Sequence, residues 1–136
     1  FSLQFPPLTP SPETLYASIK TDHMDKLSFN DEIEFNENHV ISKVIVETSF
    51  SKEIRILIKS GQVMKEHKTP FPIIIHIIQG NLKLGVQSEM YDMKDGDIIA
   101  LDGNIPHNLI AVEDSIVRLT LSKHDKVERV KSVLEN

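Results

Sequence analysis

Two histidines, His67 and His107, are the residues of this chain whose type and spacing could do chemistry. His67 lies in the segment from Gly61 to Gly80, and His107 ends the segment that begins at Gly96. Both segments couple a glycine-marked turn to an apolar run and place one histidine near a bend rich in glycine or proline. If these two similar units pack together, both imidazoles face one interior, where they are good ligands for a borderline divalent metal ion.

The elements that position these histidines are expected to be short β-strands. Apolar and β-branched runs recur between turn residues from residue 40 to residue 122, and Ile54, Ile56 and Ile58 alternate strictly with other side chains. Strands set off by turns at short, regular intervals are typical of a closed all-β barrel or sandwich. Gly96, in one of those tight turns, can take a positive φ without steric cost.

Two further local patterns also predict strands. Residues 27–35 place Phe29, Ile33 and Phe35 among polar residues and are expected to begin the strand region. Residues 108–112 and 116–121 are two apolar runs, which are expected to form a hairpin over the pair Glu113-Asp114.

Helices are expected only at the two ends of the chain. Ser11-Pro12-Glu13 is a helix-start signal, because serine caps well and proline is favoured at the first helical position. Near the other end, apolar residues recur at helical spacing. The expected organisation is an N-terminal arm and short helix (1–26), one β-barrel domain (27–122) and a C-terminal helix packed on the barrel (123–136).

The first histidine segment resembles the first sequence motif of the cupin superfamily, and the chain resembles small single-domain bacterial cupins. That motif reads G-x5-H-x-H-x3,4-E-x6-G. Gly61, His67 and Gly80 match its first glycine, first histidine and closing glycine. Thr69 stands in place of its second histidine, and Ile73 stands in place of its glutamate.

The second histidine segment resembles the second cupin motif, G-x5-P-x-G-x2-H-x3-N. Gly96 and His107 match the two ends of the segment, whereas Asp102, Asn104 and Ala111 replace the proline, the second glycine and the asparagine. The resemblance implies an RmlC-like jelly roll, also called a double-stranded β-helix, with both histidines facing its lumen.

Of the four usual cupin metal ligands, the resemblance therefore supplies two, His67 and His107. It implies a divalent transition metal (Zn, Fe, Ni or Mn) on these two residues, and a metal-free pocket with two polar residues is the alternative. Two imidazoles are rarely sufficient on their own, because catalytic sites normally add a third protein ligand. Glu66 should face the opposite side of its strand from His67, and Asp102 reaches inward only if its loop bends.

The apolar run Ile73–Ile78 contains a third histidine, His76. In a strand, residues two apart share a face, so Ile73, Ile75 and Ile77 lie together and His76 lies on the other side. If Ile73 takes the lumenal place of the family glutamate, these isoleucines and Thr69 line the pocket, and His76 is structural. A register slip of one residue would reverse that assignment.

The remaining candidate residues have structural interpretations. His39 is beside a turn and is interpreted as an exposed loop residue. The methionines Met64, Met90 and Met93 are interpreted as flexible side chains that fill gaps in a small core.

Composition removes several classes of partner. The formal net charge is −5 and no Lys/Arg cluster is present, so no nucleic-acid partner is expected. The chain has no cysteine, which excludes disulfides and thiolate ligands. The run Ile73–Ile78 is too short to cross a bilayer, so no membrane partner is expected. A cytoplasmic location is the default expectation.

Three functional classes fit these residues. The chain could be a metal-dependent oxygenase, isomerase or lyase, or a metal-free enzyme in which a histidine is the general acid or base. It could instead bind or sense a small molecule in the barrel, or be a structural protein with a vestigial pocket. The resemblance also implies a homodimer, and the apolar strand Ile73–Ile78 and the apolar N-terminal arm support this because both need cover.

Overall fold

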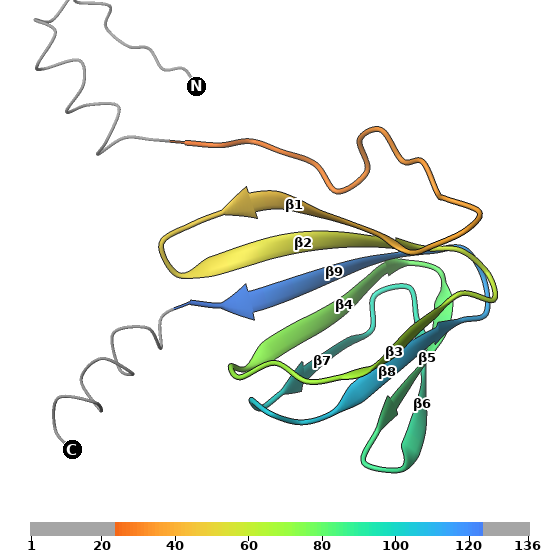
Figure 1. Ribbon diagram of the computed structural model, residues 1–136. Coiled ribbons are helices and arrows are strands. Elements are labelled where there is room, and N and C mark those ends of the chain that lie inside the picture. The colour runs from red at the N-terminus through yellow and green to blue at the C-terminus, as the bar shows by residue number, and fades with distance from the viewer. Residues whose placement is uncertain (1–23, 124–136) are drawn as a thin grey trace, which may run out of the picture.

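The alternating segments of the sequence pair into two antiparallel β-sheets that pack face to face (Figure 1). The structure, a computed structural model, describes residues 24–123, and all bounds below refer to that part of the chain. The five-stranded sheet has the order β1-β2-β9-β4-β7, and the four-stranded sheet has the order β3-β8-β5-β6. The strands are β1 (Ile41–Glu47), β2 (Ser51–Ile58), β3 (Val63–His67), β4 (Ile73–Gln79), β5 (Asn81–Val86), β6 (Glu89–Lys94), β7 (Ile98–Leu101), β8 (His107–Ala111) and β9 (Ser115–Ser122).

This two-sheet arrangement confirms the all-β jelly-roll prediction. It also shows that the hairpin expected over Glu113-Asp114 is wrong, because β8 belongs to the four-stranded sheet and β9 to the five-stranded sheet. The turn therefore crosses between sheets. The physical reason is burial: Leu109 on β8 and Val117 on β9 both line the core, and they cover it from opposite sides only if their strands do not pair with each other.

The core lies between the sheets and is formed mainly by the alternate residues of β4 and its neighbours. Ile73, Ile75 and Ile77 are 3%, 2% and 0% exposed, whereas Ile74 is 38% exposed and His76 is partly exposed. Strand β4 is hydrogen-bonded on both sides, to β9 and to β7, so its register is fixed from two directions. The alternation expected from the sequence is therefore present in the structure.

Residues 27–35 do not form the expected strand; residues 29–32 form a turn instead, and no described strand begins before Ile41. Contacts with Arg55 of β2 explain why this segment is not a strand. Its side chain is 4% exposed, and Nη1 donates to the carbonyl oxygens of Phe29 (3.3 Å) and Asp31 (2.6 Å). The guanidinium of Arg118 lies 5.6 Å from the centroid of the Phe29 ring. These contacts hold the segment against the outer face of the five-stranded sheet as irregular chain.

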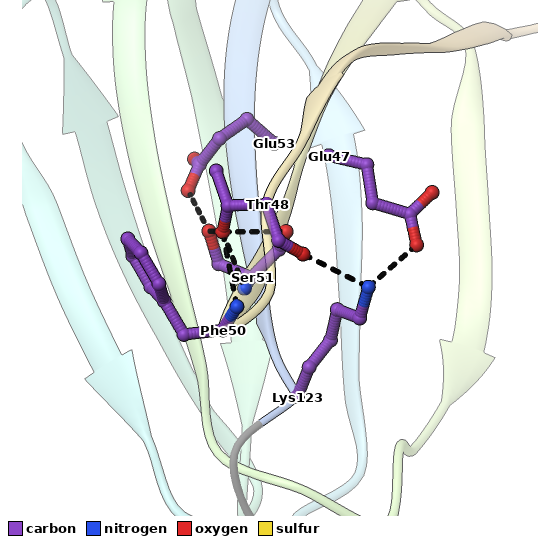
Figure 2. A network of polar contacts seen from close by, with 6 residues as sticks. All are labelled: Glu47, Thr48, Phe50, Ser51, Glu53 and Lys123. Atoms are coloured by element: carbon purple, nitrogen blue, oxygen red, sulfur yellow. Dashed lines mark hydrogen bonds and ion pairs between the residues drawn. The ribbon is translucent and has the colours of Figure 1, made fainter. Parts of the chain in front are cut away.

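The turn between β1 and β2 is held by a network of polar contacts, and Figure 2 shows this network from close by. Thr48 Oγ1 accepts hydrogen bonds from the backbone nitrogens of Phe50 and Ser51. At the end of β9, Lys123 Nζ donates to the Thr48 carbonyl (2.9 Å) and pairs with Glu47 (2.7 Å). The turn and the end of the last described strand are thus tied together.

Glu53, at the edge of that network, is a buried carboxylate on the outer face of the same sheet. It is 8% exposed and accepts hydrogen bonds from Ser51 Oγ (2.9 Å), Arg118 Nε (2.9 Å) and Thr120 Oγ1 (2.6 Å). Burial by itself raises the pKa of Glu53, but the donors Thr120, Arg118 and Ser51 outweigh it and hold the pKa below its ordinary value. Glu53 therefore stays ionised and joins β2 to β9.

The helices expected from Ser11 and over residues 123–136 lie outside the described residues, apart from Lys123, as does most of the N-terminal arm. Within residues 24–123, no helix has the length and apolar character needed to cross a bilayer.

We predict that Glu53→Gln lowers the free energy of unfolding by about 1–3 kcal/mol at pH 7, because the charged bond to Arg118 is lost. A carboxylate whose pKa is lower in the folded than in the unfolded protein stabilises the fold above the unfolded pKa, about 4.3 for glutamate. That contribution disappears as the pH falls through the folded pKa. The difference between wild type and variant should therefore shrink in acid.

Urea unfolding of wild type, Glu53→Gln and Glu89→Gln at pH 7 and pH 3 measures this effect. Glu89 is an exposed control on β6 and should change stability little at either pH. An equal loss of stability for Glu53→Gln at both pH values would show that the ionised form of Glu53 is not what joins the strands.

Candidate functional site

His67 and His107 lie side by side on the four-stranded sheet. They are direct partners in the antiparallel register of β3 and β8. Their ring centroids are 4.5 Å apart and the ring planes are inclined by 58°. The structure thus brings together two histidines that are separated by forty positions in the sequence.

A β-bulge in β3 shapes this contact. Met64 pairs with Leu109, and His67 pairs with His107. Between these two pairs the chain advances by three residues in β3 but by only two in β8. The extra residue falls at Lys65-Glu66, both of which are exposed. In a regular strand Met64 and His67 would face opposite sides, but the bulge allows both to border the same interior space.

The two imidazole rings are oriented in the same way by the backbone. His67 Nδ1 lies 2.9 Å from the carbonyl oxygen of Lys65, and His107 Nδ1 lies 2.9 Å from the carbonyl oxygen of Ile105. A carbonyl oxygen only accepts, so each Nδ1 must carry the proton and donate it. In the neutral tautomer each Nε2 then keeps a lone pair, which is the form in which histidine binds metal ions.

The two rings differ in burial. His107 is 3% exposed, whereas His67 is exposed to solvent on its strand. Burial lowers the pKa of His107, and nearby His67 lowers it further; the hydrogen bond to the Ile105 carbonyl opposes them without cancelling them. His107 is therefore held neutral near pH 7, as a ligand or proton acceptor must be.

Behind the pair lies a small enclosed cavity of about 10 Å³, close to the least space that holds one water molecule. The barrel lumen is otherwise filled by core side chains. It can therefore accept a single atom or ion beside the imidazoles without rearrangement, but not an organic molecule. Its lining consists of the two histidines and apolar side chains: Ile56, Met64, His67, Ile75, His107, Leu109, Val117 and Leu119.

In front of the pair lies an open cleft of about 490 Å³, large enough for a small molecule. Met64 and His67 border both the cleft and the enclosed cavity, so these two residues separate or link the two spaces. The cleft is lined by Asn38, His39, Val40, Gln62, Val63, Met64, Lys65 and His67.

His39 and Met64 are residues whose place at the site the sequence did not indicate. His39 is exposed, as expected, but it also lines the cleft. Its Nδ1 lies 3.1 Å from the carbonyl oxygen of Val40, the next residue, so His39 also has a backbone carbonyl as its hydrogen-bond partner. No local sequence pattern indicates that His39 or Met64 lines the cleft, because the cleft forms only where the chain before β1 meets β3.

The other sequence-predicted pocket residues are placed as follows. Ile75 lines the enclosed cavity, and Ile77 is fully buried in the core. Ile73 borders a separate groove of about 310 Å³, together with Asp102. Thr69 Oγ1 donates to the Phe71 carbonyl (3.0 Å), and Thr69 does not line the cavity. Thr69 and Ile73 are thus not brought to the imidazole pair.

Two other candidate ligands also lie away from the pair. His76 is opposite Arg118 and Ile98 in the register of β4, on the outer face of the five-stranded sheet. Glu66 lies in the bulge and is exposed. Among residues 24–123 no three side chains from His, Cys, Asp and Glu come together in a metal-binding group. The donors at the pair are therefore two imidazole nitrogens with no carboxylate.

Two loops hold the pair in place. Asn104 N donates to the Thr69 carbonyl (2.7 Å), which joins the loop before β8 to the loop after β3. Gly103 makes this approach possible, because a Cβ atom there would lie 2.4 Å from the carbonyl oxygen of Pro70. Such a contact with backbone cannot be relieved by a side-chain rotation.

Together these features define a two-sheet jelly roll with paired imidazoles on its smaller sheet. Residues 54–122 match the family model described as a cupin domain, and the chain belongs to the cupin family. The comparison with curated proteins finds no match.

Solved structures share this fold at low sequence identity. An RmlC-like cupin from Desulfovibrio desulfuricans is 18% identical, with a TM-score of 0.68 over 74% of this chain and 97% of that one. A conserved protein of unknown function from Streptococcus pyogenes is 24% identical, with a TM-score of 0.64 over 74% and 89%. KdgF from Halomonas sp. is 21% identical, with a TM-score of 0.60 over 72% and 95%. At these identities the likeness shows the fold alone.

We predict that Gly103→Ala destabilises the protein by about 1–3 kcal/mol, because the two loops must move apart. Asp102→Ala, an exposed neighbour in the same loop, is the control and should change stability by less than about 0.5 kcal/mol. Thermal or urea unfolding gives both values. Equal stabilities for the two variants would show that the loops are not in tight contact at Gly103.

Proposed function

We propose that this cupin binds a transition-metal ion through Nε2 of His67 and Nε2 of His107, and that a small molecule in the adjoining cleft completes the coordination of the ion. The observation that carries the proposal is the matched hydrogen bonding of the two rings. Both Nδ1 atoms donate to a backbone carbonyl two residues earlier, and the rings are 4.5 Å apart. This arrangement prepares two adjacent lone pairs for one electron-pair acceptor.

The donor set favours some ions over others. Imidazole nitrogen suits borderline ions such as Zn, Cu, Fe and Ni, whereas Mg²⁺ and Ca²⁺ require several oxygen ligands, which the pair does not supply. The exposure of His67 leaves a side of the site open to the cleft, where ligands from outside the protein can reach the ion. The site therefore fits an ion that keeps non-protein ligands.

The cleft favours a compact anionic molecule. Lys65 is the one charged side chain among its lining residues, and Asn38, Gln62 and His39 add polar groups. A carboxylate in the cleft would lie near the Lys65 ammonium, which attracts opposite charge. A metal ion held by the paired histidines would polarise an oxygen atom of such a molecule. The protein's own residues would hold and orient the molecule beside the ion.

We predict that untagged wild-type protein binds about one transition-metal ion per chain, and that the double variant His67→Ala/His107→Ala loses at least about tenfold in affinity. Titration with Zn(II), Ni(II), Fe(II), Mn(II) and Cu(I), followed by elemental analysis of the desalted protein, measures this. His76→Ala is the matched control, since His76 lies on another sheet and should leave binding unchanged. If no ion in this panel binds the wild type, the proposed metal function is wrong and a metal-free binding pocket takes its place.

We also propose that the protein forms a homodimer through an apolar patch on the outer face of β4 and β7. The patch consists of Ile74, Ile98 and Ala100; Ile98 is 63% exposed and Ile74 is 38% exposed. Among residues 24–123, β7 is the last strand of the five-stranded sheet, and no described strand pairs with its outer edge. An apolar face beside an open edge fits a second copy of the same sheet.

We predict that Ile98→Glu converts this dimer to a monomer, because a charge would have to be buried in the interface. Size-exclusion chromatography with light scattering gives the mass of each variant. Val112→Glu, which replaces another exposed apolar residue away from the patch, should stay dimeric. A monomeric wild type, or a dimeric Ile98→Glu, would rule out this interface.

A further inference from the structure

We infer that the ion held at the paired histidines is the soft monovalent ion Cu(I), and that Sδ of Met64 is a third protein ligand to it. This inference rests on the proposed metal-binding function and adds a ligand that sequence motifs do not supply. The position of Met64, the charge of the donor set and the size of the cavity support it.

The position of Met64 follows from the bulge in β3. Met64 is opposite Leu109, a core residue that is 3% exposed, and His67 is opposite His107. Because of the extra residue between them, Met64 and His67 both border the enclosed cavity, together with His107. Met64, whose side chain carries a thioether sulfur, and the two histidines therefore line one small space. Met64 also borders the cleft, which is open to solvent.

The charge of this donor set favours a monovalent ion. Imidazole and thioether ligands carry no negative charge, and the other cavity-lining residues, Ile56, Ile75, Leu109, Val117 and Leu119, are aliphatic. Within the described part of the chain no carboxylate joins the histidines in a metal-binding group. The free energy needed to move an ion from water into a low-dielectric space rises with the square of the ion's charge. This desolvation free energy is therefore about four times larger for a divalent ion than for a monovalent ion.

The chemical softness of the donors also favours Cu(I). Thioether and thiolate ligands select Cu(I), whereas hard divalent ions prefer oxygen. The chain contains no cysteine, so methionine is its only source of a sulfur ligand. The cavity of about 10 Å³ has space for one ion without a hydration shell. Cu(I) is stable with three or four ligands, so three protein donors hold it and a molecule in the cleft can be the fourth ligand.

A purely structural role for Met64 predicts a different result. A methionine that only fills a gap can be replaced by leucine, which has a similar volume, with little effect on any ligand. A methionine that coordinates Cu(I) cannot, because leucine has no sulfur. Met64→Leu therefore separates the two roles while keeping the cavity wall apolar.

The test is an anaerobic Cu(I) titration against a chromophoric Cu(I) chelator, with wild type, Met64→Leu and the control Met90→Leu. Met90 is 54% exposed on β6, away from the cavity lining. We expect Met64→Leu to weaken Cu(I) binding by at least about tenfold and Zn(II) binding by less than about twofold, with Met90→Leu equal to wild type. The Cu K-edge absorption spectrum of the wild-type complex should show a sulfur neighbour that is absent in Met64→Leu.

Each result has a distinct meaning. Unchanged Cu(I) affinity in Met64→Leu, or no sulfur neighbour in wild type, overturns the role of Met64, and the histidine pair then stands as the proposed site. Tighter binding of Zn(II) than of Cu(I) by wild type overturns the assignment of the ion while the metal function stands. Failure of every ion to bind overturns both proposals together.

Discussion

The pairing of β3 with β8 is the contact on which the candidate site depends. It places His67 directly opposite His107, and the bulge in β3 adds Met64 to the same side. Backbone carbonyls at Lys65 and Ile105 then hold the two rings through the same kind of hydrogen bond at Nδ1. The geometry of the site is therefore set by main-chain hydrogen bonds rather than by flexible side chains, and it is prepared before any ligand arrives.

The apolar interior explains why this site differs from the one that the family motifs imply. Ile73 takes the motif position of a glutamate, but its side chain packs in the core beside a separate groove. The lumen is filled almost completely, and the space next to the histidines is about 10 Å³. At His67, room for an organic molecule lies in the cleft outside, along β3 and the chain before β1. Met64 and His67 are the residues that border both the cavity and the cleft.

The outer face of the five-stranded sheet carries buried polar contacts at one end and exposed apolar side chains at the other. At one end Glu53 joins β2 to β9 through Arg118 and Thr120, and Arg55 holds the turn at Phe29 through its carbonyl. The Glu53 carboxylate accepts three hydrogen bonds, and Nη1 of Arg55 donates two, which makes the burial of these charges tolerable although Nε of Arg55 is buried without a partner. At the other end, β4 and β7 leave apolar side chains exposed beside an open strand edge. Among the described residues, the segment around Phe29 thus covers the outer face of the sheet at β2 and β9, whereas the outer face at β4 and β7 is exposed.

The sequence by itself determined the features that depend on local alternation and turn chemistry. The inward isoleucines of β4 follow from period-two alternation, and Gly96 takes a positive φ of 87° where a tight turn was expected. Motif spacing indicated the jelly roll, and two motif histidines indicated the candidate pair. The helices expected at the two chain ends remain predictions, because they fall outside residues 24–123.

Only the tertiary structure decided which strands pair and what each face covers. The segment after residue 107 looked like a hairpin, yet β8 and β9 lie in different sheets, because both have apolar faces that must cover one core. Residues 27–35 looked like a strand, but Arg55 binds their carbonyls as a turn. Met64 joined His67 only through a bulge, which breaks the period-two rule. These outcomes depend on long-range contacts, and such contacts leave no pattern in neighbouring residues.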